Sequence, residues 1–246
     1  MPKITPLSIK HYEQELSAIE KELAALPSGS LRLKKNFFVH FCPTTKKEKG
    51  ITKNISLQKQ LARKAYLLAR QSQLKNNLAQ PLNKHDFRKP HELIRDLPTA
   101  YQNLPAEYFY HQDVDKFLAK PPRFNTLFQE DAKYLHNHIN YRTLSEREIA
   151  RKLDENNIPF YYDIRFNTGT EDLSADFYLK NPFNGKIFLW EFFGAFHTSD
   201  YGKKMNDKMT AYRKIGFTEG DNLIATFEYH LRDTDLIQEI IDTIIW

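Results

Sequence analysis

Two acids, Asp176 and Glu191, stand where a pair of short strands could bring them together. Asp176 begins the segment 176–180 and Glu191 ends the segment 186–191, and both segments are rich in aromatic and branched residues. The turn cluster at 181–185 between them predicts an antiparallel hairpin. Counting back from that turn places Asp176 opposite Glu191, with Cβ atoms about 5 Å apart on one face. Two carboxylates at that spacing repel each other, and a hard divalent cation with oxygen ligands is the usual solution.

A lysine follows this hairpin in a helix, at a position where an apolar residue is expected. Residues 201–215 have helical periodicity, and Lys208 lies in the stripe predicted to be buried, together with Tyr201, Met205, Tyr212 and Ile215. An unpaired buried ammonium is costly, so Lys208 needs an anionic partner, and the two strand acids are the nearest candidates. In the alternative interpretation Lys208 extends its stem to solvent, the acids only begin and end strands, and the tyrosines are core residues.

Composition limits the class of protein. The chain has 246 residues, of which 41% are hydrophobic, enough for a substantial core in one large domain or two small ones. A single cysteine, Cys42, excludes a disulfide framework and a Cys-rich zinc site and is typical of a reducing compartment. No apolar run approaches the roughly 18 residues of a membrane span, and the first ten residues lack a signal-peptide core. We therefore expect a soluble, cytoplasmic protein with no membrane partner.

Charge is distributed unevenly along the chain. Residues 1–90 contain 18 Lys and Arg against 6 Asp and Glu, whereas residues 91–246 contain 18 against 25. A basic arm on an acidic body is the pattern expected when one part binds a polyanion and another binds metal. A solvated basic face with no ligand explains the asymmetry equally well.

The basic arm is predicted to consist of a helix, a hairpin and a second helix. We expect helices at 9–26 and 56–79, a hairpin at 31–42 and a charged loop at 44–50. This combination predicts a clamp over the phosphate backbone of a nucleic acid. The expected contacts are Lys34, Lys35, Lys59, Arg63 and Arg70.

The sequence divides into three expected parts. After the arm at 1–90, residues 91–141 are interrupted by prolines and should form short helices that connect it to a core at 142–246. In the core the pattern predicts the order α, β, β, β, α, β, α, with the elements outside the hairpin and its helix at 144–156, 158–166, 223–227 and 233–244.

Glu146 lies on the inward side of the first core helix, near Ile149 and Leu153. Thr143 and Glu146 also match a capping box, in which the acid only closes the start of the helix. Both interpretations of Glu146 stand. For His197, a role at the start of the helix that carries Lys208 is favoured over a place near the active edge.

This order of elements with these acids resembles the PD-(D/E)xK, or restriction-endonuclease-like, nuclease superfamily, over about 142–245. The resemblance implies a mixed sheet flanked by helices, with Mg²⁺, or Mn²⁺ in its place, held by Glu146, Asp176, Glu191 and the carbonyl of Phe192. It is closer to a branch with a Trp-Glu-x-x-Gly segment and a helix containing Tyr, Lys and Tyr, represented here by Trp190, Glu191, Gly194, Tyr201, Lys208 and Tyr212.

One position departs from the family pattern. The superfamily usually places a lysine two residues after the second acid, and here that position is Phe193. Some members are thought to supply the lysine from the following helix, which suits Lys208. The resemblance therefore implies a nuclease in which Lys208 orients the attacking water, with nucleic acid as the partner, DNA favoured over RNA, and pairing into a homodimer as in many relatives.

Two other classes of function remain as alternatives. A catalytically inactive nucleic-acid-binding protein on a nuclease-like fold is the first, and Phe193 in the lysine position supports it. The second is a protein-interaction module that uses the basic arm on an acidic partner, which predicts no salt-sensitive affinity for nucleic acid.

Overall fold

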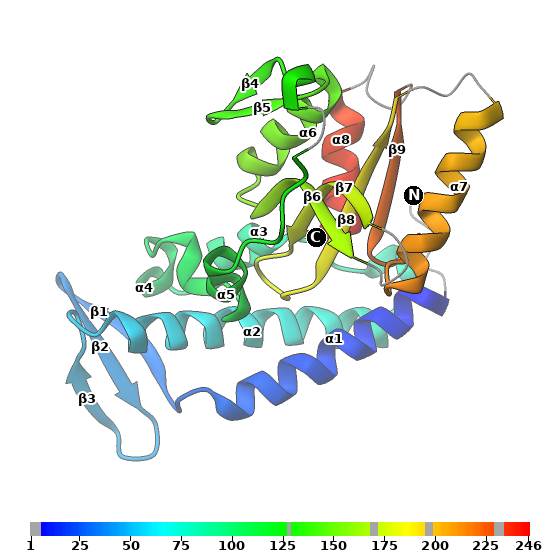
Figure 1. Cartoon of the computed structure of the whole chain (residues 1–246). Coiled ribbons are helices and arrows are strands. Elements are labelled where there is room, and N and C mark those ends of the chain that lie inside the picture. The colour runs from blue at the N-terminus through cyan, green and yellow to red at the C-terminus, as the bar shows by residue number, and fades with distance from the viewer. Residues whose placement is uncertain (1–5, 127–128, 168–171, 195–198, 229–233) are drawn as a thin grey trace. The chain divides into compact units, whose positions relative to one another are not determined.

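The computed structural model describes residues 6–126, 129–167, 172–194, 199–228 and 234–246, and the contacts between them form two compact units, Met1–His111 and Gln112–Trp246 (Figure 1). The protein is of the mixed α/β type. The division falls at residue 111 and not at the boundaries of 90 and 141 expected from the sequence. Within the described residues, no helix has the length and apolar character needed to cross a membrane.

The first unit combines two long helices with a small sheet. Helix α1 covers Pro6–Ala25 and α2 covers Ile55–Ala79, close to the two helices expected, and they pack against each other. Between them lie three antiparallel strands in the order β1-β2-β3, at Ser30–Lys34, Phe37–Cys42 and Lys47–Gly50.

The expected hairpin in this unit is confirmed, but the charged loop after it is wrong in part. Lys35 takes a left-handed backbone conformation (φ 53°) at the β1–β2 turn, where the chain reverses. Residues 47–50 pair with 39–42 as a third strand. All four residues of β3 are exposed. Alternation between buried and exposed side chains, the pattern from which a strand is predicted, is therefore missing there.

Short helices follow α2, as expected for the proline-interrupted segment. The first unit contains η1 Leu82–Lys84, α3 Pro90–Arg95, α4 Thr99–Gln102 and η2 Ala106–Phe109, and the second begins with α5 Asp113–Ala119 and η3 Gln129–Asp131. A small hairpin that the sequence did not predict comes next, formed by β4 Tyr134–His136 and β5 Ile139–Tyr141. Its turn residues Asn137 and His138 have positive φ angles of 44° and 65°.

The remainder of the second unit follows the predicted order α, β, β, β, α, β, α. The elements are α6 Leu144–Glu155, β6 Phe160–Asn167, β7 Asp172–Lys180, β8 Ile187–Phe193, α7 Ser199–Lys214, β9 Leu223–Phe227, α8 Thr234–Ile240 and the π-helical turn η5 Ile241–Ile245. The four strands form one sheet in the order β6-β7-β8-β9. The first three are antiparallel neighbours and β9 runs parallel to β8, so the sheet is mixed.

Two buried clusters lie on the two faces of this sheet. One contains Ile149, Leu153, Ile237 and Ile241 and joins α6 and α8 to the sheet. The other contains Met209 and residues of β6 to β9, and joins α7 to the opposite face. In Figure 1, α6 and α8 accordingly lie on one side of the strands and α7 on the other.

The β6–β7 ribbon turns over in the middle of the sheet. Tyr162 and its partner Phe177 belong to the cluster under α6 and α8, whereas Ile164 and its partner Ala175 belong to the cluster under α7. Residues two apart in a regular strand share a face, so the backbone must rotate between them. Asp163 supplies the rotation, because its φ of 51° lies in the left-handed region and the ladder passes over it. This irregular point is where the polar side chains gather.

Candidate active site

The hairpin register is the one counted from the sequence. Residues 177–180 of β7 pair with 187–190 of β8, and the same register continued by one step sets Asp176 opposite Glu191. The described ladder stops before that step. The next amide, Phe192 N, donates instead to Asp176 Oδ2 at 2.8 Å. The two strands therefore separate at the acids, and the Asp176 side chain closes the end of the ladder.

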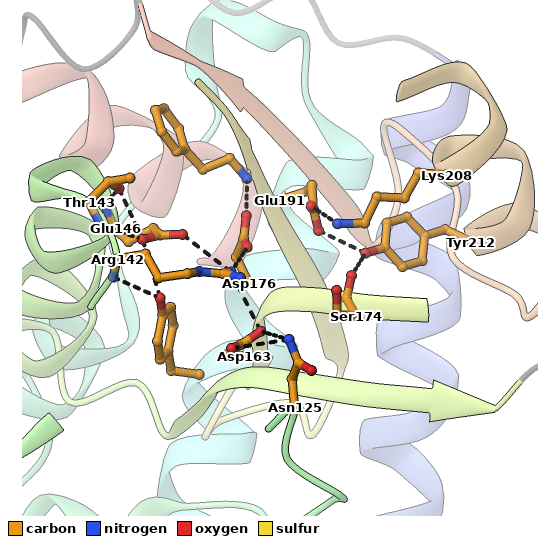
Figure 2. A network of polar contacts seen from close by, with 12 residues as sticks. Asn125, Arg142, Thr143, Glu146, Asp163, Ser174, Asp176, Glu191, Lys208 and Tyr212 are labelled. Carbon is orange, nitrogen blue, oxygen red and sulfur yellow. Dashed lines mark hydrogen bonds and ion pairs between the residues drawn. The ribbon is translucent and has the colours of Figure 1, made fainter. Parts of the chain in front are cut away.

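A third acid, Asp163, lies next to the pair Asp176 and Glu191, and the three carboxylates form a row across the sheet, the acid row. Asp163 lies opposite Asp176 on β6, because the pairs on either side of it keep one register. Arg142 neutralises part of this row: its Nη2 lies 3.0 Å from Asp176 Oδ1, 3.5 Å from Asp163 Oδ1 and 3.6 Å from Glu146 Oε1 (Figure 2). One guanidinium thus connects three carboxylates that come from α6, β6 and β7.

Glu146 closes its helix and faces the acid row at once. Its Oε2 accepts hydrogen bonds from Thr143 N at 2.7 Å, Thr143 Oγ1 at 3.0 Å and the Tyr162 hydroxyl at 3.2 Å. The capping box is therefore present. The other oxygen is the one nearest Arg142. Burial raises the pKa of Glu146, and the negative charge of Asp176 raises it further.

Lys208 lies beside the hairpin acids. Its ammonium forms an ion pair with Glu191 Oε1, as the sequence predicted from its place on the buried stripe of α7. Burial alone would lower the pKa of Lys208, but Glu191 and Asp176 outweigh it and raise that pKa. The alternative in which Lys208 extends to solvent is wrong, because the nitrogen is held against a buried carboxylate.

Tyr212 holds the second oxygen of Glu191. Its hydroxyl lies 2.8 Å from Glu191 Oε2 and 2.7 Å from the carbonyl of Ser174. One hydroxyl proton cannot serve both acceptors. The Tyr212 hydroxyl therefore donates to one of these two oxygens at a time. Core packing is therefore only part of the role of Tyr212.

The pKa of Glu191 lies near neutral pH. Burial, followed by the charge of Asp176, raises its pKa from 4.5 to about 7, against the opposing effect of Lys208. Burial likewise raises the pKa of Asp176, with Lys208 opposing. Three buried carboxylates with raised pKa values, beside two cations in the described part of the chain, form a site that favours additional positive charge.

The carboxylates fit a divalent ion in kind, but their present partners are protein cations. Hard oxygen donors are the ligands that Mg²⁺ prefers. No group of three or more His, Cys, Asp or Glu side chains in the described ranges is arranged to hold a metal ion. Arg142 stands among three of the acids and Lys208 on the fourth. A metal would therefore require Arg142 to withdraw from the carboxylates.

Two of the basic residues expected to contact nucleic acid face inward. Arg63 donates to both oxygens of Glu22, at 2.7 and 2.8 Å, and to the carbonyl of Phe109 at 2.9 Å. Arg70 binds both oxygens of Glu15 at 2.8 Å. These pairs join α2 to α1. The expectation that both arginines contact phosphate conflicts with this placement, because their guanidinium groups are bonded to carboxylates of α1. Their spacing did put them on one face, but that face is covered.

The lysines of the arm are placed differently. Lys34 forms an ion pair with Glu48 on β3, and Lys35 is exposed at the turn before β2. Lys59 lies 5.7 Å from the centre of the Tyr108 ring, a cation–π contact within the first unit. Lys34 and Lys35 are therefore the exposed residues among the predicted contacts.

Several residues of the site were not found from the sequence. Asp163 is an acid inside a strand of aromatic residues, and extending the register count to β6 would have placed it opposite Asp176. Arg142 directly precedes the capping box and carries no pattern of its own. His197 lies outside the described residues, as does the side chain of Tyr201.

The chain itself matches no protein-family model, no curated protein and no solved structure.

Proposed function

We propose that this protein is a metal-dependent nuclease that hydrolyses phosphodiester bonds of nucleic acid, with DNA favoured over RNA. The observation that carries the proposal is the contact of Lys208 with Glu191 beside Asp176, at the point where the two strands separate. The resemblance to the PD-(D/E)xK superfamily implies this lysine on this acid. The order of elements and the mixed sheet also suit the restriction-endonuclease-like core that the resemblance implies.

The roles in this proposal follow from the chemistry of each group. Asp176, Glu191 and Glu146 would hold Mg²⁺, or Mn²⁺ in its place, together with the Phe192 carbonyl. A bound divalent ion supplies Lewis acidity, which activates water and neutralises phosphoryl charge. Lys208 presents an ammonium beside these oxygens, where it can orient the attacking water and stabilise negative charge in the transition state.

Nucleic acid in this proposal contacts the β1–β3 sheet in preference to α2. Residues 30–53 contain seven Lys and Arg and a single acid, Glu48. Most of this stretch is exposed, including Lys35, Lys46, Lys47 and Lys49. Such a density of positive charge on a narrow ribbon suits a phosphate backbone. Lysines on an edge strand also have a second explanation, because they prevent the edges of two sheets from pairing. The salt dependence of nucleic-acid binding distinguishes this role from phosphate contact.

A cleavage panel tests the nuclease. Linear, circular, single-stranded and double-stranded DNA, with RNA counterparts, are incubated with the parent and with Asp176→Ala in Mg²⁺ and in Mn²⁺. We expect cleavage by the parent and loss of at least about 100-fold in the variant, because an electrostatic catalytic group is removed. Asp172→Ala is the matched control on the same strand, where Asp172 pairs with Arg165. Equal cleavage by Asp176→Ala would show the assignment to be wrong.

One observation favours a second function, nucleic-acid binding without catalysis. Arg142 contacts three of the four acids, and Phe193 takes the position where the superfamily usually has its lysine. Calorimetric titration with Mg²⁺ and Mn²⁺ separates the two functions. The nuclease requires metal binding that disappears in Asp176→Ala. Absence of metal binding, combined with salt-sensitive affinity for nucleic acid, would favour the inactive protein.

A further inference from the structure

A cavity of about 640 Å³ lies beside the acid row, at the edge of β6. Arg142 and Asp163 belong to its wall, so it is continuous with the candidate active site. Phe124, Tyr161 and Tyr162 are among the residues that line it, and Asn140 lines it from the β4–β5 hairpin. Cavities of this size hold one small organic molecule.

The aromatic walls are fixed by hydrogen bonds at their hydroxyl groups. The Tyr161 hydroxyl donates a hydrogen bond to the carbonyl of Phe117 at 2.8 Å. The Tyr162 hydroxyl accepts from Arg142 N at 3.1 Å and contacts Glu146 Oε2 at 3.2 Å. Rings positioned before a ligand arrives lose little conformational freedom on binding, which favours affinity.

Phe124 is held against β6 although its side chain is exposed. Arg165 N donates to the carbonyl of Arg123 at 2.7 Å, and Asn125 N donates to the carbonyl of Asp163 at 2.8 Å, so the backbone on both sides of Phe124 pairs with the edge strand. Phe124 is 46% exposed and its ring packs edge-on to that of Tyr161, with ring centres 6.0 Å apart. A large apolar side chain fixed at a cavity wall is available for stacking.

The polar groups of the cavity suit the edge of a base. Asn140 carries an amide with both donor and acceptor atoms, which matches the hydrogen-bonding edge of a nucleobase. The Asn125 amide lies 3.1 Å from Asp163 Oδ1, linking the cavity wall to the acid row (Figure 2). Arg142 stands at the end nearest the carboxylates, where the phosphate of a nucleotide would lie.

We propose that this cavity binds one nucleobase of the substrate strand, next to the phosphate that is cleaved. The inference rests on the proposed nuclease function. Stacking on Phe124 and Tyr161 accepts any base, and Asn140 provides discrimination between bases. The base is held on the aromatic side, and its phosphate is directed toward Arg142 and the metal-binding acids.

A fluorescent nucleoside tests the cavity independently of catalysis. The probe is 2-aminopurine deoxyriboside, which carries a base and a sugar but no phosphate, titrated in EDTA. We expect saturable quenching with the parent and with Asp176→Ala. Binding should weaken about 5- to 100-fold in Phe124→Ala, the range for loss of one stacking contact, and by a similar factor in Asn140→Ala, through loss of hydrogen bonds to the base edge. Phe87→Ala and Asn103→Ala, at exposed positions of the first unit, are the matched controls and should bind as the parent does.

The outcomes separate the cavity from the nuclease. Nucleoside binding with the expected variant pattern, in a protein that cleaves nothing, would support the cavity and overturn the nuclease. An active nuclease whose parent shows no saturable quenching, or whose four variants bind alike, would overturn the cavity. If the protein is active, Asn140→Ala should also raise KM and change the preferred base at one position while kcat stays within about twofold.

Discussion

Glu191 has a carboxyl group whose protonation changes near physiological pH. Its folded pKa of about 7 lies above the usual 4.5, so the folded state binds more protons than the unfolded state between these values. The free energy of unfolding should therefore fall as pH rises from 4.5 to 7, by up to about 3 kcal/mol from this group.

Replacing this carboxyl tests the effect. In Glu191→Gln the side chain does not titrate, and the fall in unfolding free energy between pH 4.5 and 7 should be smaller than in the parent. Urea unfolding at several pH values gives the comparison. The two proteins should differ least well below pH 4.5, where Glu191 is protonated in both the folded and the unfolded state. Parallel pH curves for parent and variant would contradict the raised pKa.

Individual residues of the site were predictable only where they interrupted a periodic pattern in the sequence. Lys208 was found because a charged residue interrupts an apolar helical stripe. Arg142 and the hydroxyl of Tyr212 were not, since an arginine before a helix and a tyrosine on a core face are ordinary in sequence. Their roles depend on which carboxylates the fold brings to them, and that information is tertiary.

At the scale of elements, two partly buried ion pairs join α1 to α2. Glu15 pairs with Arg70 and Glu22 with Arg63, each through two oxygens. Removing one partner of a buried pair leaves an uncompensated charge and costs about 3–5 kcal/mol. We expect Arg63→Ala to destabilise the first unit by an amount in this range, measured by chemical denaturation. The double variant Glu22→Leu/Arg63→Met should recover most of the loss. A loss of less than about 1 kcal/mol in Arg63→Ala would show that the pair is not structural.

The lysines of the β1–β3 sheet give a second prediction for an element. Each phosphate contact contributes about 0.9 to the slope of log K against log salt concentration. Changing Lys35, Lys46, Lys47 and Lys49 to Ala should therefore reduce the slope by about 2–4, measured by fluorescence anisotropy with labelled DNA. The same substitutions at Lys10, Lys21, Lys75 and Lys84, which are exposed on other elements, form the control and should leave most of the slope. Equal loss in both variants would assign binding to net charge alone.

Strands were predictable where turns fixed them. The β7–β8 register followed from the 181–185 turn, in which Asn181 Oδ1 accepts from Phe183 N at 2.8 Å and Asn184 N at 3.0 Å. Strand β3 and the β4–β5 hairpin were missed. Residues 47–50 are held by backbone pairing with 39–42, and their charged side chains give no strand signal.

At the scale of the whole chain, the excess of basic residues and the candidate site fall on different units. The first unit, 1–111, has 19 Lys and Arg against 9 Asp and Glu, and the second, 112–246, has 17 against 22. We expect a fragment of residues 1–111 to bind DNA with the salt dependence of the full chain. A fragment of residues 112–246 should bind Mn²⁺ in calorimetry and lose this in Asp176→Ala. Full DNA affinity in the second fragment alone would contradict the separation of roles.

The order of elements in the second unit was predictable, but the boundary between units was not. The prolines after residue 90 indicated a connecting segment. Leu93 and Tyr101 are nevertheless buried, and the Tyr101 hydroxyl accepts from Leu31 N at 2.8 Å, which attaches this segment to β1. Prolines in a sequence indicate where helices end. Which unit a segment belongs to depends on contacts with residues far away in the sequence, and prolines do not predict these.

The guanidinium of Arg142 also bears on how the chain reaches its native state. Because the side chain already bridges Glu146, Asp163 and Asp176, much of their mutual repulsion is relieved within the polypeptide itself. A newly synthesised molecule can therefore reach its native state in a metal-poor environment and persist through purification in chelators. In the proposed nuclease, folding and metal binding would therefore be separate events, with the ion needed for the reaction and not for the native structure.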